Sequence, residues 1–92
     1  MDRIIKTDGT IIAIRPQNGS DYQLGELQDI VQGYIEIISD RNGKEIMVFN
    51  EEGKLMGFPI NATATQWLKE RANIVDDFVV GDVLVCDAKH VK

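Results

Sequence analysis

A chain of 92 residues with 43% apolar and 27% charged residues has the composition of one globular domain, which excludes a disordered chain and two independent cores. Its net charge of −5 disfavours nucleic-acid backbones and anionic membrane surfaces as partners, because both bind clustered Lys and Arg. The single cysteine, the lack of a signal-peptide pattern and the lack of an apolar run of about 18 residues predict a cytoplasmic protein without a membrane span.

The first predicted element is a β-hairpin. Its strands are Arg3 to Lys6 and Thr10 to Arg15, and the turn Thr7-Asp8-Gly9 lies between them. Asp-Gly favours a tight turn because both positions tolerate positive φ angles. Pro16 ends the second strand, since proline has no N–H to donate to a neighbouring strand.

A helix is predicted from Asp21 to Gln32. Apolar residues recur there at the spacing of one helix face: Leu24, Leu27, Ile30 and Val31. Ser20 or Asp21 is expected to cap its start, and Gly33 is expected to be the left-handed residue that follows its end.

A second hairpin follows the helix. Tyr34 to Ser39 and Glu45 to Asn50 are rich in β-branched and aromatic residues, and Asn42-Gly43 between them is a strong hairpin signal. A turn at Glu52-Gly53 then predicts a short strand from Lys54 to Phe58 that returns against the previous one.

The last elements are a second helix capped by Asn61 and a buried strand within residues 78–87. The apolar face of this helix contains Ala64, Trp67, Leu68 and Ala72. The element order predicts an α+β fold: a single domain of residues 1–92, with a mainly antiparallel sheet of about five strands and two helices.

The sequence lacks the paired groups that catalysis requires. His90 is expected to be solvated near the end of the chain, and Cys86 is expected to be a buried structural thiol in the last strand. We therefore predict no enzyme activity and no catalytic residues. The alternative is a small enzyme that uses Glu51 or Glu52 as a general base. Both adjoin a turn glycine, however, where contact with water keeps the pKa of a carboxyl group at its ordinary value.

No cofactor or metal site is predicted. The chain has no cluster of Cys and His for zinc and no glycine-rich phosphate-binding motif. Four aspartates near its end are candidate ligands for a hard cation, but their spacing matches no binding loop: Asp76, Asp77, Asp82 and Asp87.

One set of residues suggests an anionic ligand. The start of the second helix offers free N–H groups near Asn61 and Thr63, and Arg41 and Lys54 are candidate cations. Tyr22 precedes the first helix in a polar segment and is predicted to be an exposed contact residue. The alternative for Asn61 is that it only caps its own helix.

The segment Leu24–Glu36 reads LGELQDIVQGYIE and resembles a small uncharacterised family, domain of unknown function 3846. The similarity continues through residues 50–55, 59–61 with Ala64, and 80–85, and so covers nearly the whole chain. Gly25 and Gln32 stand where the family pattern has Glu and Gly. The resemblance implies a short protein of phages, plasmids or other mobile elements, and it transfers no catalytic or binding residues.

Together these features suggest a non-enzymatic binding module of the counter-defence type. It would sequester a small anionic, nucleotide-like signal, or it would present an acidic face that blocks a host protein. Besides the carboxylate-dependent enzyme, a purely structural role remains open, in which exposed strand edges form a homo-oligomer.

Overall fold

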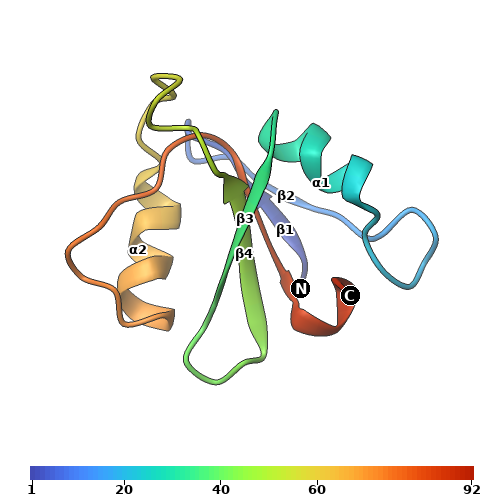
Figure 1. The fold of residues 1–92 in the computed structure, drawn as a ribbon. Helices are drawn as coiled ribbons and strands as arrows, with labels where there is room; N and C mark the ends of the chain where they lie inside the picture. The colour runs from blue at the N-terminus through green and yellow to red at the C-terminus, as the bar shows by residue number, and fades with distance from the viewer.

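The computed structural model describes all 92 residues and contains one five-stranded antiparallel sheet with a helix on each face (Figure 1). The strand order is β2-β1-β5-β4-β3. The elements in chain order are β1 (Arg3–Ile5), β2 (Ile11–Ala13), α1 (Leu24–Val31), β3 (Ile35–Ser39), β4 (Glu45–Asn50), α2 (Ala62–Arg71), β5 (Val83–Asp87) and a 3-10 turn, η1 (Ala88–His90). The predicted α+β class, with its antiparallel sheet and two helices, is confirmed.

The core lies on both sides of β5, the central strand. Val83 and Val85 pack in the cluster that contains Trp67 of α2, while Leu84 and Cys86 pack in the cluster that contains Leu27 of α1. Because side chains alternate along a strand, a strand covered on both faces is apolar at consecutive positions. β5 also pairs directly with β1, so the first and last strands of the chain lie side by side.

Helix α1 starts three residues after the predicted start and ends one residue before the predicted end. Gln23 precedes its first turn, and its N–H donates to the Glu26 carboxylate at 2.7 Å, so Ser20 and Asp21 are not the cap. The left-handed residue is Gln32, at φ 64°, and not Gly33. Gly33 is required for space instead, because a Cβ atom there would come within 2.7 Å of Nδ2 of Asn50.

The predicted strand from Lys54 to Phe58 is wrong. Residues 51–57 form consecutive turns, in which the Met56 N–H donates to Glu52 O at 3.0 Å. β4 is already paired on one side with β3 and on the other with β5, so it has no free edge for a returning strand. The turns leave Leu55 88% exposed.

Helix α2 begins at the predicted cap. Asn61 is fully buried, and its Oδ1 accepts the Ala64 N–H at 3.0 Å. Its Nδ2 donates to Ile5 O and to Gly81 O, each at 2.9 Å. We call these contacts the Asn61 cluster; they join β1, the segment before β5, and α2. Neither helix has the length and apolar character that crossing a bilayer requires.

Candidate functional site

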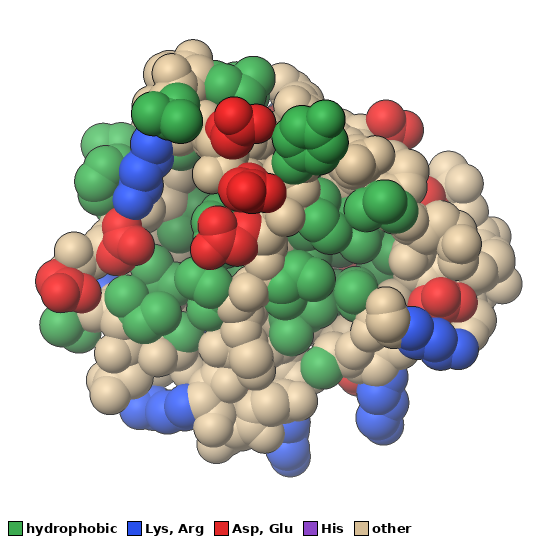
Figure 2. Space-filling view, viewed as in Figure 1, with side chains coloured by type: hydrophobic (Ala, Val, Ile, Leu, Met, Phe, Trp, Pro, Cys, Tyr) green, Lys and Arg blue, Asp and Glu red, His purple; other side chains and the backbone are tan.

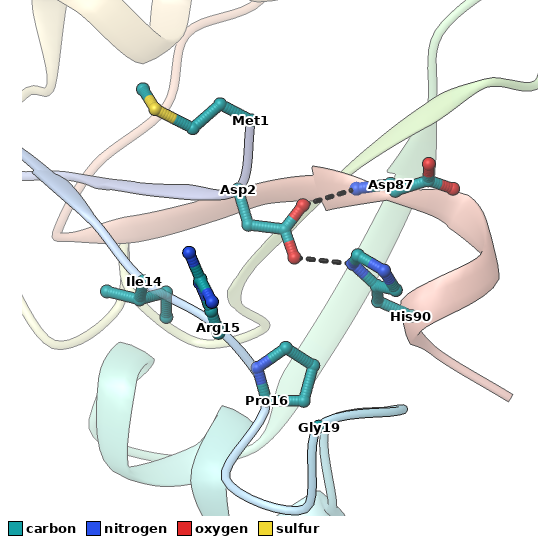
Figure 3. Close-up of a pocket in the computed structure, with 8 residues that line it drawn as sticks. All are labelled: Met1, Asp2, Ile14, Arg15, Pro16, Gly19, Asp87 and His90. Carbon is teal, nitrogen blue, oxygen red and sulfur yellow. Dashed lines mark hydrogen bonds and ion pairs between the residues drawn. The ribbon is translucent and has the colours of Figure 1, made fainter.

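One pocket, which we call the Asp2 pocket, lies beside the paired first and last strands. Its volume is about 410 Å³, a size typical of small-molecule sites, and Figure 3 shows its lining. Three segments contribute to it: the start of β1, the connection between β2 and α1, and the end of β5 with η1. The lining residues are Met1, Asp2, Ile14, Arg15, Pro16, Gly19, Asp87 and His90.

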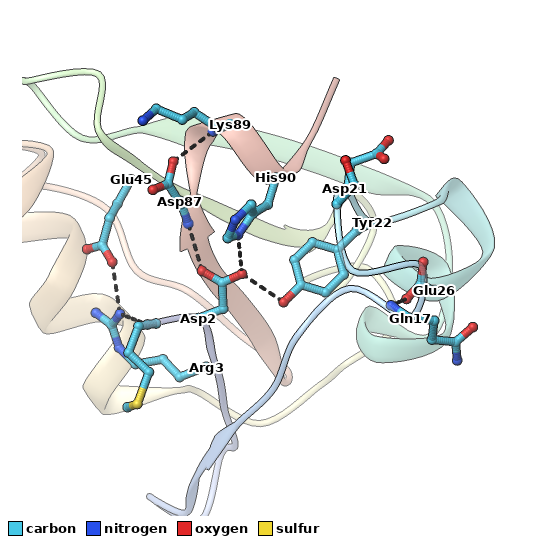
Figure 4. A network of polar contacts seen from close by, with 12 residues as sticks. Asp2, Arg3, Gln17, Asp21, Tyr22, Glu26, Glu45, Asp87, Lys89 and His90 are labelled. Atoms are coloured by element: carbon cyan, nitrogen blue, oxygen red, sulfur yellow. Dashed lines mark hydrogen bonds and ion pairs between the residues drawn. The ribbon is translucent and has the colours of Figure 1, made fainter.

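A buried carboxylate organises this pocket. Asp2 Oδ2 accepts the Tyr22 hydroxyl at 2.9 Å and lies 2.6 Å from Nδ1 of His90. Its Oδ1 accepts the Asp87 N–H at 2.9 Å, and the Asp2 side chain is only 6% exposed (Figure 4). We call these four residues the Asp2 cluster. It ties together segments that are 88 residues apart in the chain.

The electrostatics of the Asp2 cluster keep the carboxyl group ionised and the phenol neutral. Burial by itself would raise the pKa of Asp2, but the Asp87 N–H, His90 and Tyr22 outweigh it and lower the pKa below the ordinary value. Burial and the adjacent Asp2 carboxylate raise the pKa of Tyr22 well above its ordinary value.

His90 is held rather than freely solvated, which corrects the prediction from sequence. Its Nδ1 faces Asp2, its ring packs edge-on against Tyr22 with centroids 6.4 Å apart, and its side chain is 38% exposed. When Nδ1–H donates to the Asp2 carboxylate, Nε2 remains available to a ligand, and it makes no hydrogen bond within the protein.

Arg15 supplies the positive charge of the pocket. It is exposed, and it forms no ion pair with any carboxylate of the chain. Figure 3 shows its side chain between Ile14 and Asp2, on the opposite side of the pocket from Asp87. A guanidinium group without a protein partner can offer its planar set of donors to a phosphate or carboxylate.

Cys86 is a structural thiol, as predicted. It is fully buried in the α1-side core, where burial, followed by the charges of Asp2 and Asp87, raises the pKa of its thiol to about 12. A thiol in that state is a poor nucleophile, because only the thiolate reacts readily.

The five residues predicted from sequence as ligand contacts do not converge on one site. Asn61 is buried with its polar atoms bonded, and Tyr22 is 4% exposed, so the predicted exposure of Tyr22 is wrong. Thr63 is exposed in the first turn of α2, whereas the Arg41 guanidinium donates to Glu70 O in its last turn. Thr63 and Glu70 are seven residues apart on this helix, which is about 10 Å along its axis.

Lys54 lies in the turns after β4. Its Nζ is 2.6 Å from Asp77 Oδ1 and 4.2 Å from the centre of the Phe78 ring, beside a smaller pocket of about 170 Å³. The two glutamates considered as a general base, Glu51 and Glu52, are both exposed in the same turns. No three Asp, Glu, His or Cys side chains come together in a metal-binding arrangement.

Sequence reasoning missed Asp2, Arg15 and His90 as a group. Their proximity follows from the pairing of β1 with β5, which places residue 2 beside the end of the last strand. The one available signal was that the last strand is apolar and had no partner strand assigned from the sequence.

A family model described as Domain of unknown function (DUF3846) matches residues 1–91. The chain belongs to this family. No curated protein and no solved structure matches the chain. DUF3846 membership therefore confirms the resemblance read from the sequence, while a role for the Asp2 cluster has to be argued from its geometry.

Proposed function

We propose that this DUF3846 domain is a non-enzymatic binding module that takes a small anionic, nucleotide-like ligand in the pocket beside the Asp2 cluster. One observation carries the proposal: an exposed guanidinium without an ion-pair partner and an imidazole held by a buried carboxylate line the same 410 Å³ pocket. The overall charge of −5 repels anions, so anion binding needs a local group of positive charge such as the Arg15 guanidinium.

The two donors have different roles in this proposal. Arg15 binds a phosphate or carboxylate through two parallel N–H donors, and His90, when protonated, adds a donor from Nε2. The Asp2 carboxylate oxygens do not face the ligand, because Tyr22, His90 and the Asp87 N–H are hydrogen-bonded to them. The Asp87 carboxylate also lines the pocket, so the anionic group of a ligand lies on the Arg15 side.

We favour binding without turnover because no Ser, Thr, Cys or Lys side chain that His90 could activate lines the pocket. In the phage or mobile-element setting that the family resemblance implies, such a module would sequester a nucleotide signal of host defence. The pocket supports an anionic ligand, and the family resemblance supplies only the phage or mobile-element setting.

Isothermal titration calorimetry and native mass spectrometry test the proposal with inorganic phosphate, mononucleotides and cyclic dinucleotides. We expect one of these classes to bind, and Arg15→Gln to weaken its binding by about tenfold or more, since a charge-assisted hydrogen bond contributes about 1.5–3 kcal/mol.

The matched control is Arg71→Gln, which makes the same charge change on an exposed residue at the end of α2. It is expected to leave binding unchanged. An absence of binding to every probe, or an equal loss in both variants, contradicts the proposal.

A further inference from the structure

β3 forms one open edge of the sheet and pairs only with β4. The Glu51 N–H donates to Tyr34 O and the Asp40 N–H donates to Glu45 O, each at 2.9 Å, so the hydrogen-bonded pairs of this ladder involve the even-numbered residues of β3. The N–H and C=O groups of Ile35, Ile37 and Ser39 consequently point away from the sheet, without a partner strand.

This edge has few of the features that protect open edges from pairing. It contains no proline, no lysine and no bulge, and Ile37 at its centre is 42% exposed. Figure 2 looks onto this side of the molecule and shows apolar side chains on both sides of a strip of exposed backbone. The opposite edge, β2, is shorter and presents only Ile11 and Ala13 outward, because Lys6 N–H donates to Thr10 O and Ile14 N–H donates to Asp2 O.

We propose that β3 pairs with β3 of a second copy of this chain, antiparallel and related by a two-fold axis at Ile37. In such a pair, the outward N–H and C=O groups of one β3 must face those of the other β3. This condition allows the two-fold axis to pass beside residue 36, 37 or 38. A centre at Glu36 places two like charges directly opposite, which is destabilising. A centre at Ile38 places Glu36 opposite Asp40. Only the centre at Ile37 pairs all five residues of β3 without opposing two acids.

Charge complementarity identifies a second copy as the partner. The end of the hairpin where β3 starts is acidic, with exposed Glu36 and Glu51, and its turn is basic, with exposed Arg41 and Lys44. In Figure 2, most acidic side chains lie toward the top of this face, with one basic side chain at the upper left, and the other basic side chains lie along the bottom. A two-fold axis at Ile37 brings the basic turn of each copy to the acidic end of the other, so the surface complements itself.

Native mass spectrometry and light scattering over a concentration series test this pairing. We expect a dimer of twice the 10.3 kDa chain mass. Ile37→Lys should weaken dimerisation by about tenfold or more, because residue 37 faces itself and the substitution places two ammonium groups opposite each other. Ile12→Lys is the matched control: Ile12 lies on the other edge strand and is 41% exposed, and its substitution should leave the dimer intact.

Two further variants keep the test informative if Ile37→Lys folds poorly. Ile37→Pro removes one outward N–H and no bond to β4. Ile37→Cys should give a covalent dimer on mild oxidation, since facing Cα atoms in such a pair lie about 5.5 Å apart and the native Cys86 is buried. Ile12→Cys should not. A wild-type protein that is monomeric at every accessible concentration, or a dimer that only the Ile12 variants disrupt, overturns the proposal.

Discussion

The Asn61 cluster and the Asp2 cluster lie at opposite ends of the β1–β5 pair and join three segments each, but they use different chemistry. Asn61 is neutral and fully buried, and every polar atom of its side chain has a protein partner. Asp2 carries a charge, and its partner His90 is partly exposed to the pocket. The comparison shows that a closed polar cluster can only hold the fold, whereas an open one can also present a group to a ligand.

The largest expected effect is on the closed cluster. Asn61→Ala removes a helix cap and leaves the carbonyls of Ile5 and Gly81 without this donor. We expect the free energy of unfolding to fall by about 3 kcal/mol, from about 1 kcal/mol for the cap and about 1 kcal/mol for each lost hydrogen bond. Urea unfolding followed by Trp67 fluorescence measures this loss.

Thr63→Ala is the control on the same helix. Thr63 is exposed and makes no side-chain hydrogen bond, so a change of less than about 0.5 kcal/mol is expected. Equal losses in the two variants would show that the Asn61 contacts do not stabilise the fold.

The open cluster should differ by being sensitive to pH. The pKa of Asp2 is lowered in the folded state because the Asp87 N–H, His90 and Tyr22 outweigh its burial. Its stabilising contribution is therefore complete above the ordinary value of 3.8 and is lost as the pH falls through the folded pKa. Asp2→Asn should lower the free energy of unfolding by about 2 kcal/mol at neutral pH. The loss should be smaller in acid, because the wild-type Asp2 is protonated there and loses the same charge.

Urea unfolding at several pH values between neutral and acid measures this difference. Asp77, whose pKa the Lys54 hydrogen bond lowers, should preserve part of the acid sensitivity in the variant. Asp29→Asn is the control, since Asp29 is exposed and has no hydrogen-bond partner. If the difference in the free energy of unfolding between wild type and Asp2→Asn stays constant in acid, the Asp2 charge does not contribute to stability as described.

The smallest expected effect is that of Tyr22→Phe. The substitution removes one of the three donors to Asp2 and keeps the ring in place, so a loss of about 1 kcal/mol is expected. Ligand binding should change little, because Tyr22 does not line the Asp2 pocket. Tyr34→Phe provides the comparison: Tyr34 is 67% exposed, and its hydroxyl has no partner. A larger stability loss from Tyr34→Phe than from Tyr22→Phe would contradict this order.

Local sequence patterns predicted the elements whose signals are complete within a few residues. Asp8-Gly9 and Asn42-Gly43 fixed both hairpins, and Asn61 marked the start of α2. The segment from Lys54 to Phe58 was misjudged because strand formation there depends on whether β4 still has a free edge, and a local pattern does not contain that information. Tyr22 was misjudged for the same reason, since its ring packs in the α1-side core and its hydroxyl donates to a carboxylate 20 residues away.

Patterns within the chain were therefore enough to predict the class of fold, the two hairpins, the cap of α2, the burial of Cys86 and the family. Which residues share a site depends on how the strands pair in three dimensions. β1 and β5 pair across the full length of the chain, and this pairing brings Asp2 to Asp87 and His90 and creates the pocket with Arg15. Periodicity and turn chemistry act over a few residues, whereas the pocket depends on contacts between residues nearly 90 positions apart.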